Sequence, residues 1–100
     1  MELHHTLHDG KYVIHPTGEI VFETAHRLRD FFGSLLEEKG YCFTLDLRDV
    51  THIDSTGLGA ILSLKALLEH QGRSFQIRNA SAPVKHRLEV AGLVDVVHFH

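Results

Sequence analysis

The sequence has a single cysteine, few glycines and prolines, and no long uninterrupted apolar run. Cys42 therefore excludes an intramolecular disulfide, and its apolar neighbours predict a buried, unreactive thiol. Eight glycines and two prolines in 100 residues are too few for a fibrous or disordered chain. No apolar stretch approaches the roughly 20 residues that span a bilayer, and the N-terminus lacks the basic-then-apolar pattern of a signal peptide. We therefore expect a cytoplasmic protein with no membrane insertion.

Clusters of basic residues are missing as well. The ten Lys and Arg are scattered, and the formal net charge is −3. Nucleic-acid-binding domains normally carry a basic stripe, so no nucleic-acid partner is predicted. Ten histidines raise the question of a metal, but no helix-like segment has metal-binding histidine spacing and no second cysteine is present. The sequence predicts neither a metal site nor a cofactor.

The remaining composition suits one packed domain, with 43% hydrophobic and 23% charged residues. The predicted elements are strands over 3–8 and 11–15 around an Asp9-Gly10 hairpin turn, a segment over 16–20 that leaves the hairpin, a helix over 22–39, a strand over 41–47, a helix over 55–70, a strand over 74–78, a short helix begun by Pro83 and ended by Gly92, and a strand over 94–99. The order β-β-α-β-α-β-α-β predicts a single α/β domain over residues 1–100. It would contain a mixed sheet with helices packed on it, because strands that alternate with helices pair in parallel through right-handed crossovers.

The turn before the second long helix is the most informative segment. Asp54 and Ser55 are both favoured N-cap residues, and Thr56 adds a third polar side chain. Gly57 and Gly59 each cost the helix roughly 1 kcal/mol relative to alanine. We expect the close approach of another backbone, a ligand or a partner to compensate for that cost. Because a helix N-terminus accommodates negative charge, a hydroxyl here could also receive a phosphate without melting the helix.

The helix that follows this turn has two different sides. The side expected to face the sheet is apolar and comprises Gly57, Ala60, Ile61, Leu64, Leu67 and Leu68. The opposite side is made mostly of small residues and comprises Thr56, Gly59, Ser63, Ala66 and His70. Such a stripe suits either a docking partner or a solvated face.

An enzymatic site is not predicted. His52, Asp54 and Ser55 lie within one turn of chain, which does not give the converging geometry of a catalytic triad. No glycine-rich phosphate loop of P-loop or Rossmann spacing is present. We therefore expect a binding module, not an enzyme.

Several motifs together carry a family resemblance. The segment Asp54-Ser55-Thr56-Gly57-Leu58-Gly59, preceded by Leu45-Asp46-Leu47, resembles the signature of the anti-sigma factor antagonists of the STAS domain family. Gly18-Glu19-Ile20 is similar to the segment that precedes the first helix in that family, and Val90-Ala91-Gly92-Leu93 to its closing pattern. The resemblance extends over nearly the whole chain.

The resemblance implies a phosphorylation switch. Ser55, directly after the aspartate, corresponds to the phosphoacceptor, with Thr56 the second choice and Asp54 holding the turn. The implied partner is an anti-sigma factor that is also a serine kinase, which the unphosphorylated protein binds; the kinase uses ATP and Mg²⁺, and a phosphatase resets the switch. The implied partner-binding residues are Asp54, Ser55, Thr56, Gly57, Leu58, Gly59, Ser63, Val21 and Phe22.

One position departs from the family pattern. The family commonly has an aspartate directly after its Gly-Glu-Ile/Leu segment, whereas this chain has Val21 followed by Phe22. The edge of the expected partner surface is therefore apolar. This departure leaves open an alternative, in which the chain is a STAS-type subunit of another assembly, such as a lipid-transporting ABC system or a signalling complex, and uses the same helix face.

Overall fold

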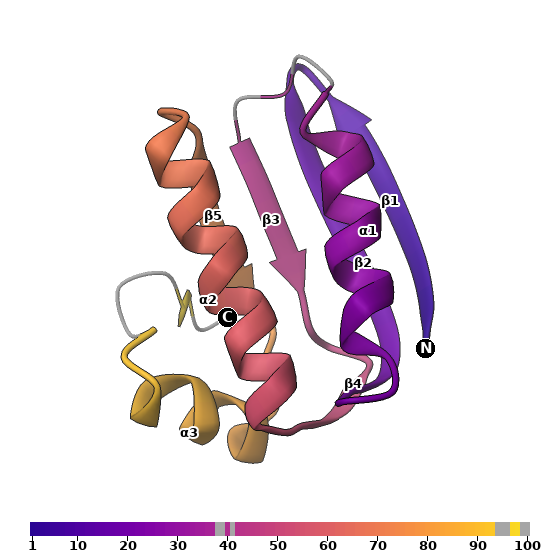
Figure 1. Cartoon of the computed structure of the whole chain (residues 1–100), viewed down its shortest axis with the longest axis vertical. Helices are drawn as coiled ribbons and strands as arrows, with labels where there is room; N and C mark the ends of the chain where they lie inside the picture. The colour runs from indigo at the N-terminus through magenta and orange to yellow at the C-terminus, as the bar shows by residue number, and fades with distance from the viewer. Residues whose placement is uncertain (38–39, 41, 94–96, 99–100) are drawn as a thin grey trace.

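A computed structural model describes residues 1–37, 40, 42–93 and 97–98. Each helix lies in the chain between strands, and β1–β2 and β3–β4 follow each other with no helix between them (Figure 1). The elements are β1 (Glu2–His8), β2 (Lys11–Ile20), α1 (Ala25–Leu35), β3 (Cys42–Asp46), β4 (Val50–Ile53), α2 (Ser55–His70), β5 (Ser74–Arg78), α3 (Ala82–Val90) and β6 (Val97–His98).

The strands form one mixed sheet in the order β1-β2-β3-β5-β6, with β4 paired to β2. β1 and β2 are antiparallel, and every other pair is parallel. Asp9 and Gly10 join the hairpin with φ angles of 51° and 76°, as a type I′ turn requires. The predicted hairpin and the predicted α/β fold with a mixed sheet are therefore confirmed.

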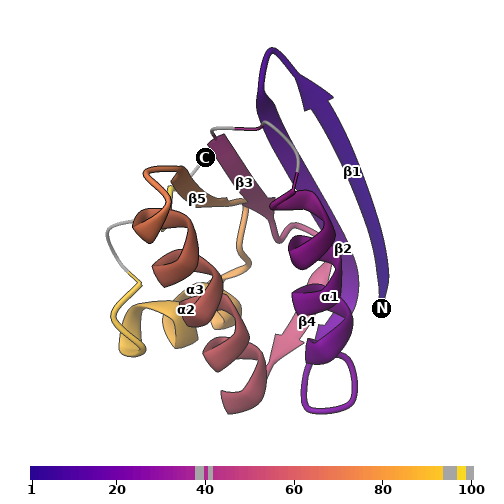
Figure 2. The same cartoon turned by 45° about the horizontal axis from the view of Figure 1, so that its top comes forward.

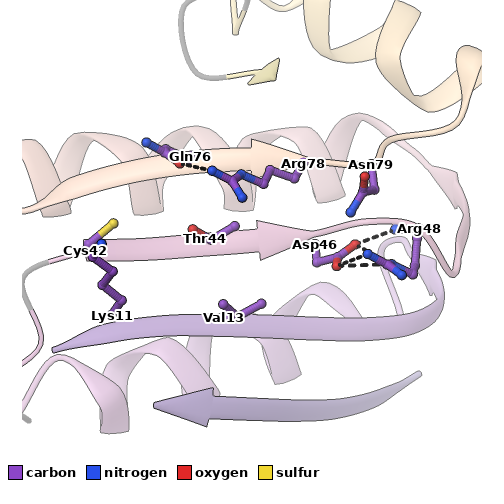
Figure 3. Close-up of a pocket in the computed structure, with 9 residues that line it drawn as sticks. All are labelled: Lys11, Val13, Cys42, Thr44, Asp46, Arg48, Gln76, Arg78 and Asn79. Carbon is purple, nitrogen blue, oxygen red and sulfur yellow. Dashed lines mark hydrogen bonds and ion pairs between the residues drawn. The ribbon is translucent and has the colours of Figure 1, made fainter. Parts of the chain in front are cut away.

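Helices α1 and α2 lie side by side on one face of the sheet (Figures 1 and 2). Helix α3 packs against β4 at one end of the sheet. The core fills the space between the three helices and the sheet. Its largest fully buried side chains are Phe32, Phe43, Ile14, Ile20, Leu28, Leu45, Leu47, Ile53, Ile61, Leu68, Ile77 and Leu88. On the opposite face of β2, β3 and β5, which we call the open face, side chains point away from α1 and α2 (Figure 3).

The connection between β3 and α2 contains a strand, so the prediction of a plain loop there was wrong. β4 covers only Val50–Ile53, with both ends buried and Thr51 and His52 exposed. This pattern lacks the strict alternation that marks a half-buried strand. Pairing with β2, which lies far away in sequence, makes it a strand.

The segment over 16–20 also stays in the sheet, contrary to the prediction that it leaves. β2 pairs with β3 up to Ile14 and with β4 from Gly18, with an irregularity in register between Gly18 and Glu19. Pro16 falls between these two ladders, where its missing N–H removes no hydrogen bond to β3 or β4. A proline is therefore tolerated inside a continuous strand.

Helix α1 begins later than predicted, at Ala25 instead of Phe22, and ends at Leu35. Phe22 continues the apolar spacing of the helix in sequence, but it lies in the preceding turn with 72% of its surface exposed. The predicted end of this helix at 38–39, the first residue of the strand predicted from 41, and residues 94–96 and 99 of the last predicted strand lie outside the described residues.

Two burial predictions were also wrong. Cys42 is only half-buried, because Phe43 and Leu45 point to the helices and strand alternation sends Cys42 to the open face of the sheet. Leu67 is 41% exposed, at the edge of the apolar side of α2. The other five residues predicted for that side are buried.

Candidate functional site

Asp54 caps the start of α2, as the sequence predicts. Its backbone is extended, with φ −96° and ψ −175°, and its Oδ1 accepts a hydrogen bond from the N–H of Gly57 at 2.9 Å. This is the usual N-cap geometry, in which a side-chain oxygen satisfies a free N–H of the first turn. The cap leaves Ser55 as the first helical residue, with its side chain exposed to solvent.

The second carboxylate oxygen of Asp54 reaches a different part of the chain. Oδ2 accepts from the N–H of Phe22 at 2.9 Å, and the N–H of Asp54 donates to the carbonyl of Ile20 at 3.3 Å. One side chain therefore ties the β2–α1 turn to the first turn of α2. Sequence reasoning placed Val21 and Phe22 near the switch only through the family resemblance and did not identify this link.

Thr24 fixes the turn that carries Val21 and Phe22. Its hydroxyl donates to the carbonyl of Glu19 at 2.6 Å and accepts from the N–H of Val21 at 2.9 Å. Sequence reasoning missed this residue. Threonine is a favoured residue at the position before a helix, so Thr24 was a usable signal for the true start of α1.

Gly57 lies where two backbones meet. An added Cβ would stand 2.0 Å from the carbonyl oxygen of Ile20 at the end of β2, so only glycine fits. This contact bears out the expected close approach of another backbone. Gly59 is different, because it is exposed and a Cβ there would meet nothing within 4 Å. No contact in the described residues accounts for the second glycine.

The predicted site residues form one continuous region, with two adjustments. Ser55, Gly59 and Ser63 are exposed along α2, and the Ser63 hydroxyl donates to the carbonyl of Gly59 at 2.9 Å. Thr56 and Leu58 are half-buried, so Thr56 does not belong fully to the exposed stripe. The link through Asp54 adds the exposed ring of Phe22 and the half-buried Val21 to this region. We call this region the switch surface.

A shallow apolar pocket of about 320 Å³ adjoins the switch surface. It lies between the first turn of α2 and helix α3 and is lined by Leu58, His86, Arg87, Val90 and Ala91. Val90 is 75% exposed. Sequence reasoning used Val90 only as part of a helix and of the closing family pattern, and it missed this pocket, since nothing in the sequence indicates that α3 lies beside Leu58.

The carboxylate of Asp54 is held in its ionised form. The N–H of Gly57 lowers its pKa most; desolvation opposes this, and the N–H groups of Phe22 and Thr56 and the nearby His52 lower it further. The net pKa lies below the usual value of 3.8. Both oxygens are thus engaged by backbone donors, and no hydrogen bond joins His52 to Ser55 among the described residues.

Asp54→Asn should remove a pH-dependent part of the stability. A depressed pKa in the folded state stabilises the protein above the unfolded pKa, and that contribution is lost as the pH falls through the lower, folded value. We expect the variant to unfold at lower urea concentration than the wild type at about pH 7, and the difference to shrink below about pH 4. The depressed pKa of Asp46 is common to both proteins and cancels in the comparison. A difference that stays constant with pH would contradict this assignment.

No group of three or more His, Cys, Asp or Glu in the described part of the chain lies close enough to hold a metal ion. Across the same residues, none of the helices combines the length and the apolar character needed to cross a membrane.

Comparisons with known proteins agree on one family. The sequence model of the STAS domain matches residues 3–100. The anti-sigma-B factor antagonist of Bacillus subtilis is 32% identical over 80 residues, which are 80% of this chain and 72% of the relative. SpoIIAA, an anti-sigma factor antagonist solved in its unphosphorylated form, is similar in fold, with a TM-score of 0.87 and 17% identity over 99% of this chain and 88% of its own.

The phosphorylated form of Bacillus SpoIIAA is similar in fold as well, with a TM-score of 0.81 and 16% identity over 99% of this chain and 91% of its own. At these identities the two structures establish the fold. The family match over nearly the whole chain and the 32% identity to the B. subtilis relative establish membership. The chain belongs to the STAS domain family and is of the anti-sigma factor antagonist type.

Proposed function

We propose that this protein binds an anti-sigma factor that is also a serine kinase, and that phosphorylation of Ser55 weakens the complex. The observation that carries the proposal is the position of Ser55, exposed as the first residue of α2 directly after the capping Asp54. Relatives of this chain are named antagonists of anti-sigma factors, and one similar fold has been solved in a phosphorylated form. Ser55 would be a substrate of the partner, not a catalyst.

The location suits a switch that acts at the surface. A phosphate at a helix N-terminus is stabilised by the helix dipole and the free N–H groups, so it does not melt the helix. The Gly57 N–H is already taken by Asp54, whose carboxylate stays ionised. Phosphorylation would therefore add a charge of about −1.5 to −2 beside the negative charge of Asp54. A partner that fits the unmodified surface would then meet strong repulsion or an unmatched desolvation cost.

The switch surface offers the partner two kinds of contact. Gly59 and Ser63 are small and exposed, which allows a partner backbone to approach α2 closely. Phe22 projects an exposed apolar ring. It directly follows Val21, which stands at the position where the family commonly has an aspartate. An exposed aromatic residue beside a rigid turn is a typical binding anchor. We propose that Phe22 and the shallow apolar pocket beside Val90 select a partner surface that is more apolar than the family pattern implies.

Ser55→Ala should abolish phosphorylation by the cognate kinase. The unmodified protein, incubated with that kinase, ATP and Mg²⁺, should gain one phosphate detected by intact-mass spectrometry and mapped to Ser55. Thr56→Ala is the matched control, because it removes the neighbouring hydroxyl, and it should still gain one phosphate. The phosphorylated protein should bind the kinase at least about tenfold more weakly, a loss of about 1.4 kcal/mol. Phosphorylation at another residue, or an unchanged affinity for the kinase after phosphorylation, would contradict the proposal.

A second experiment, affinity capture, tests the alternative assembly. If the chain is a STAS-type subunit of a lipid-transporting ABC system or another signalling complex, affinity capture should retrieve an ATPase or permease subunit in place of the kinase. Ser55→Ala would then leave the complex intact and no phosphate would be found.

We further propose that the chain acts as one domain in the cytoplasm and that a phosphatase removes the phosphate from Ser55.

A further inference from the structure

The face of the sheet opposite α1 and α2 carries a second candidate site, in a pocket of about 370 Å³ (Figure 3). Side chains of β2, β3 and β5 line it, together with residues that directly follow β3 and β5. Its floor is polar where a central strand is commonly apolar, because Thr44 and Asp46 are both buried there. A pocket of this volume is in the range of small-molecule sites.

The one acid in the pocket is already neutralised. Arg48 lies against Asp46, with Nε at 3.1 and 3.2 Å from the two carboxylate oxygens. Burial raises the pKa of Asp46, but the N–H and the guanidinium of Arg48 and the side chain of Asn79 outweigh it, so the net pKa is lowered. Asp46 is therefore ionised and paired, and it leaves the rest of the pocket positively charged.

Two further cations line the pocket and have no acidic partner among the described residues. The guanidinium of Arg78 donates only to Gln76, at 3.4 Å, and forms no ion pair there. Lys11 forms no ion pair there either, and its side chain borders the pocket from β2. Both residues are exposed, so a bound anion would neutralise charges that are solvated in the free protein.

The register of the strands separates these cations along the pocket. Lys11 pairs with Cys42 at the start of β3, whereas Arg78 pairs with Asp46 at its end. Four residues of a strand span about 13 Å. From this position the guanidinium of Arg78 turns back along β5 to Gln76, between the Asp46 end of the pocket and Lys11 (Figure 3). The two cations come from separate places along the pocket, which suits an elongated molecule with an anionic group near each of them.

We propose that this pocket binds a small metabolite-sized anion, with a phosphate or carboxylate group held by the guanidinium of Arg78 beside Gln76 and its other end directed along β3 toward Lys11. A planar guanidinium can donate two parallel hydrogen bonds to either kind of oxyanion. The site is on the opposite face of the sheet from α2, so it does not depend on the proposed role of Ser55.

The test is a titration of the ¹⁵N-labelled protein with three probes, followed by amide chemical shifts. Inorganic phosphate, citrate and fructose 1,6-bisphosphate are added separately, each against sodium chloride at equal ionic strength. We expect saturable shifts at Thr44, Arg78 and Asn79 for at least one probe, with a Kd on the order of 1 mM or tighter. The phosphate and citrate arms distinguish a phosphorylated ligand from a carboxylate.

Charge-matched variants make the result specific. Arg78→Gln should weaken binding about tenfold or more, whereas Arg29→Gln, which removes an exposed arginine on α1, should leave it unchanged. Lys11→Gln should weaken the binding of fructose 1,6-bisphosphate and leave the binding of inorganic phosphate unchanged. The Ser55→Ala variant should bind every probe as the wild type does. The proposal fails if no probe gives saturable shifts, or if Arg29→Gln and Arg78→Gln weaken binding equally, because a merely solvated basic face would behave in that way.

Discussion

Gly57→Ala is expected to lower the free energy of unfolding by about 1–3 kcal/mol, the usual cost of forcing atoms into a packed site. The added methyl group would lie 2.0 Å from the carbonyl oxygen of Ile20, which is backbone and cannot rotate away. The first turn of α2 would therefore have to move away from β2, and the Asp54 hydrogen bonds to Gly57 and Phe22 would lengthen. Urea-induced unfolding followed by circular dichroism measures the loss.

Gly59→Ala is the matched control, two residues further along the same helix. Its added methyl group meets nothing within 4 Å, and alanine favours the helix by up to about 1 kcal/mol over glycine. The two substitutions should thus change stability in opposite directions. If Gly57→Ala were neutral, or if both variants lost the same stability, the close contact with Ile20 would not be what requires glycine.

Phe32→Ala should be the most destabilising of the substitutions considered, with a loss of about 3–5 kcal/mol. Phe32 is fully buried between α1 and the sheet. Its ring lies 6.2 Å from that of Phe43 and 6.4 Å from that of Phe75, the second in an edge-on arrangement. Truncation would leave a cavity beside two aromatic rings held by β3 and β5. For a domain of this size, each kcal/mol lowers Tm by about 4–8 °C, which calorimetry resolves easily.

Phe22→Ala changes the same residue type only ten positions earlier and should behave oppositely. Phe22 is 72% exposed, so its loss should change stability by no more than about 0.5 kcal/mol. On the proposed function, the same variant should instead bind the partner kinase more weakly. A large stability loss at Phe22, or a small one at Phe32, would contradict the assignment of one ring to the surface and the other to the core.

These contrasts also show which parts of the structure could be predicted from the sequence. Helix α2, its cap at Asp54 and the β1–β2 hairpin were predictable because their signals are local: a capping residue, a helical period and an Asp-Gly turn. The start of α1 was mistaken because Phe22 fits the apolar period. Thr24 decides the matter by bonding back to Glu19 and Val21, and apolar periodicity does not register that contact.

Other features depend on contacts between distant segments and could not be read from local patterns. β4 is a strand because three of its four residues, Val50, His52 and Ile53, pair with the far end of β2. The pocket on the open face arises because Lys11, Arg48 and Arg78 come from separate parts of the chain and line the same face of adjacent strands. In the sequence, Arg48 and Arg78 are simply the charges expected at strand ends.

The bridging carboxylate of Asp54 has a consequence for how a partner is bound. The two segments it joins, the turn at Phe22 and the first turn of α2, are held together before any partner arrives. On the proposed function, association then need not order this turn, so less conformational entropy is lost on binding. The heat capacity of binding should accordingly reflect the apolar area covered at Phe22 and Val90, without the larger change that accompanies coupled folding.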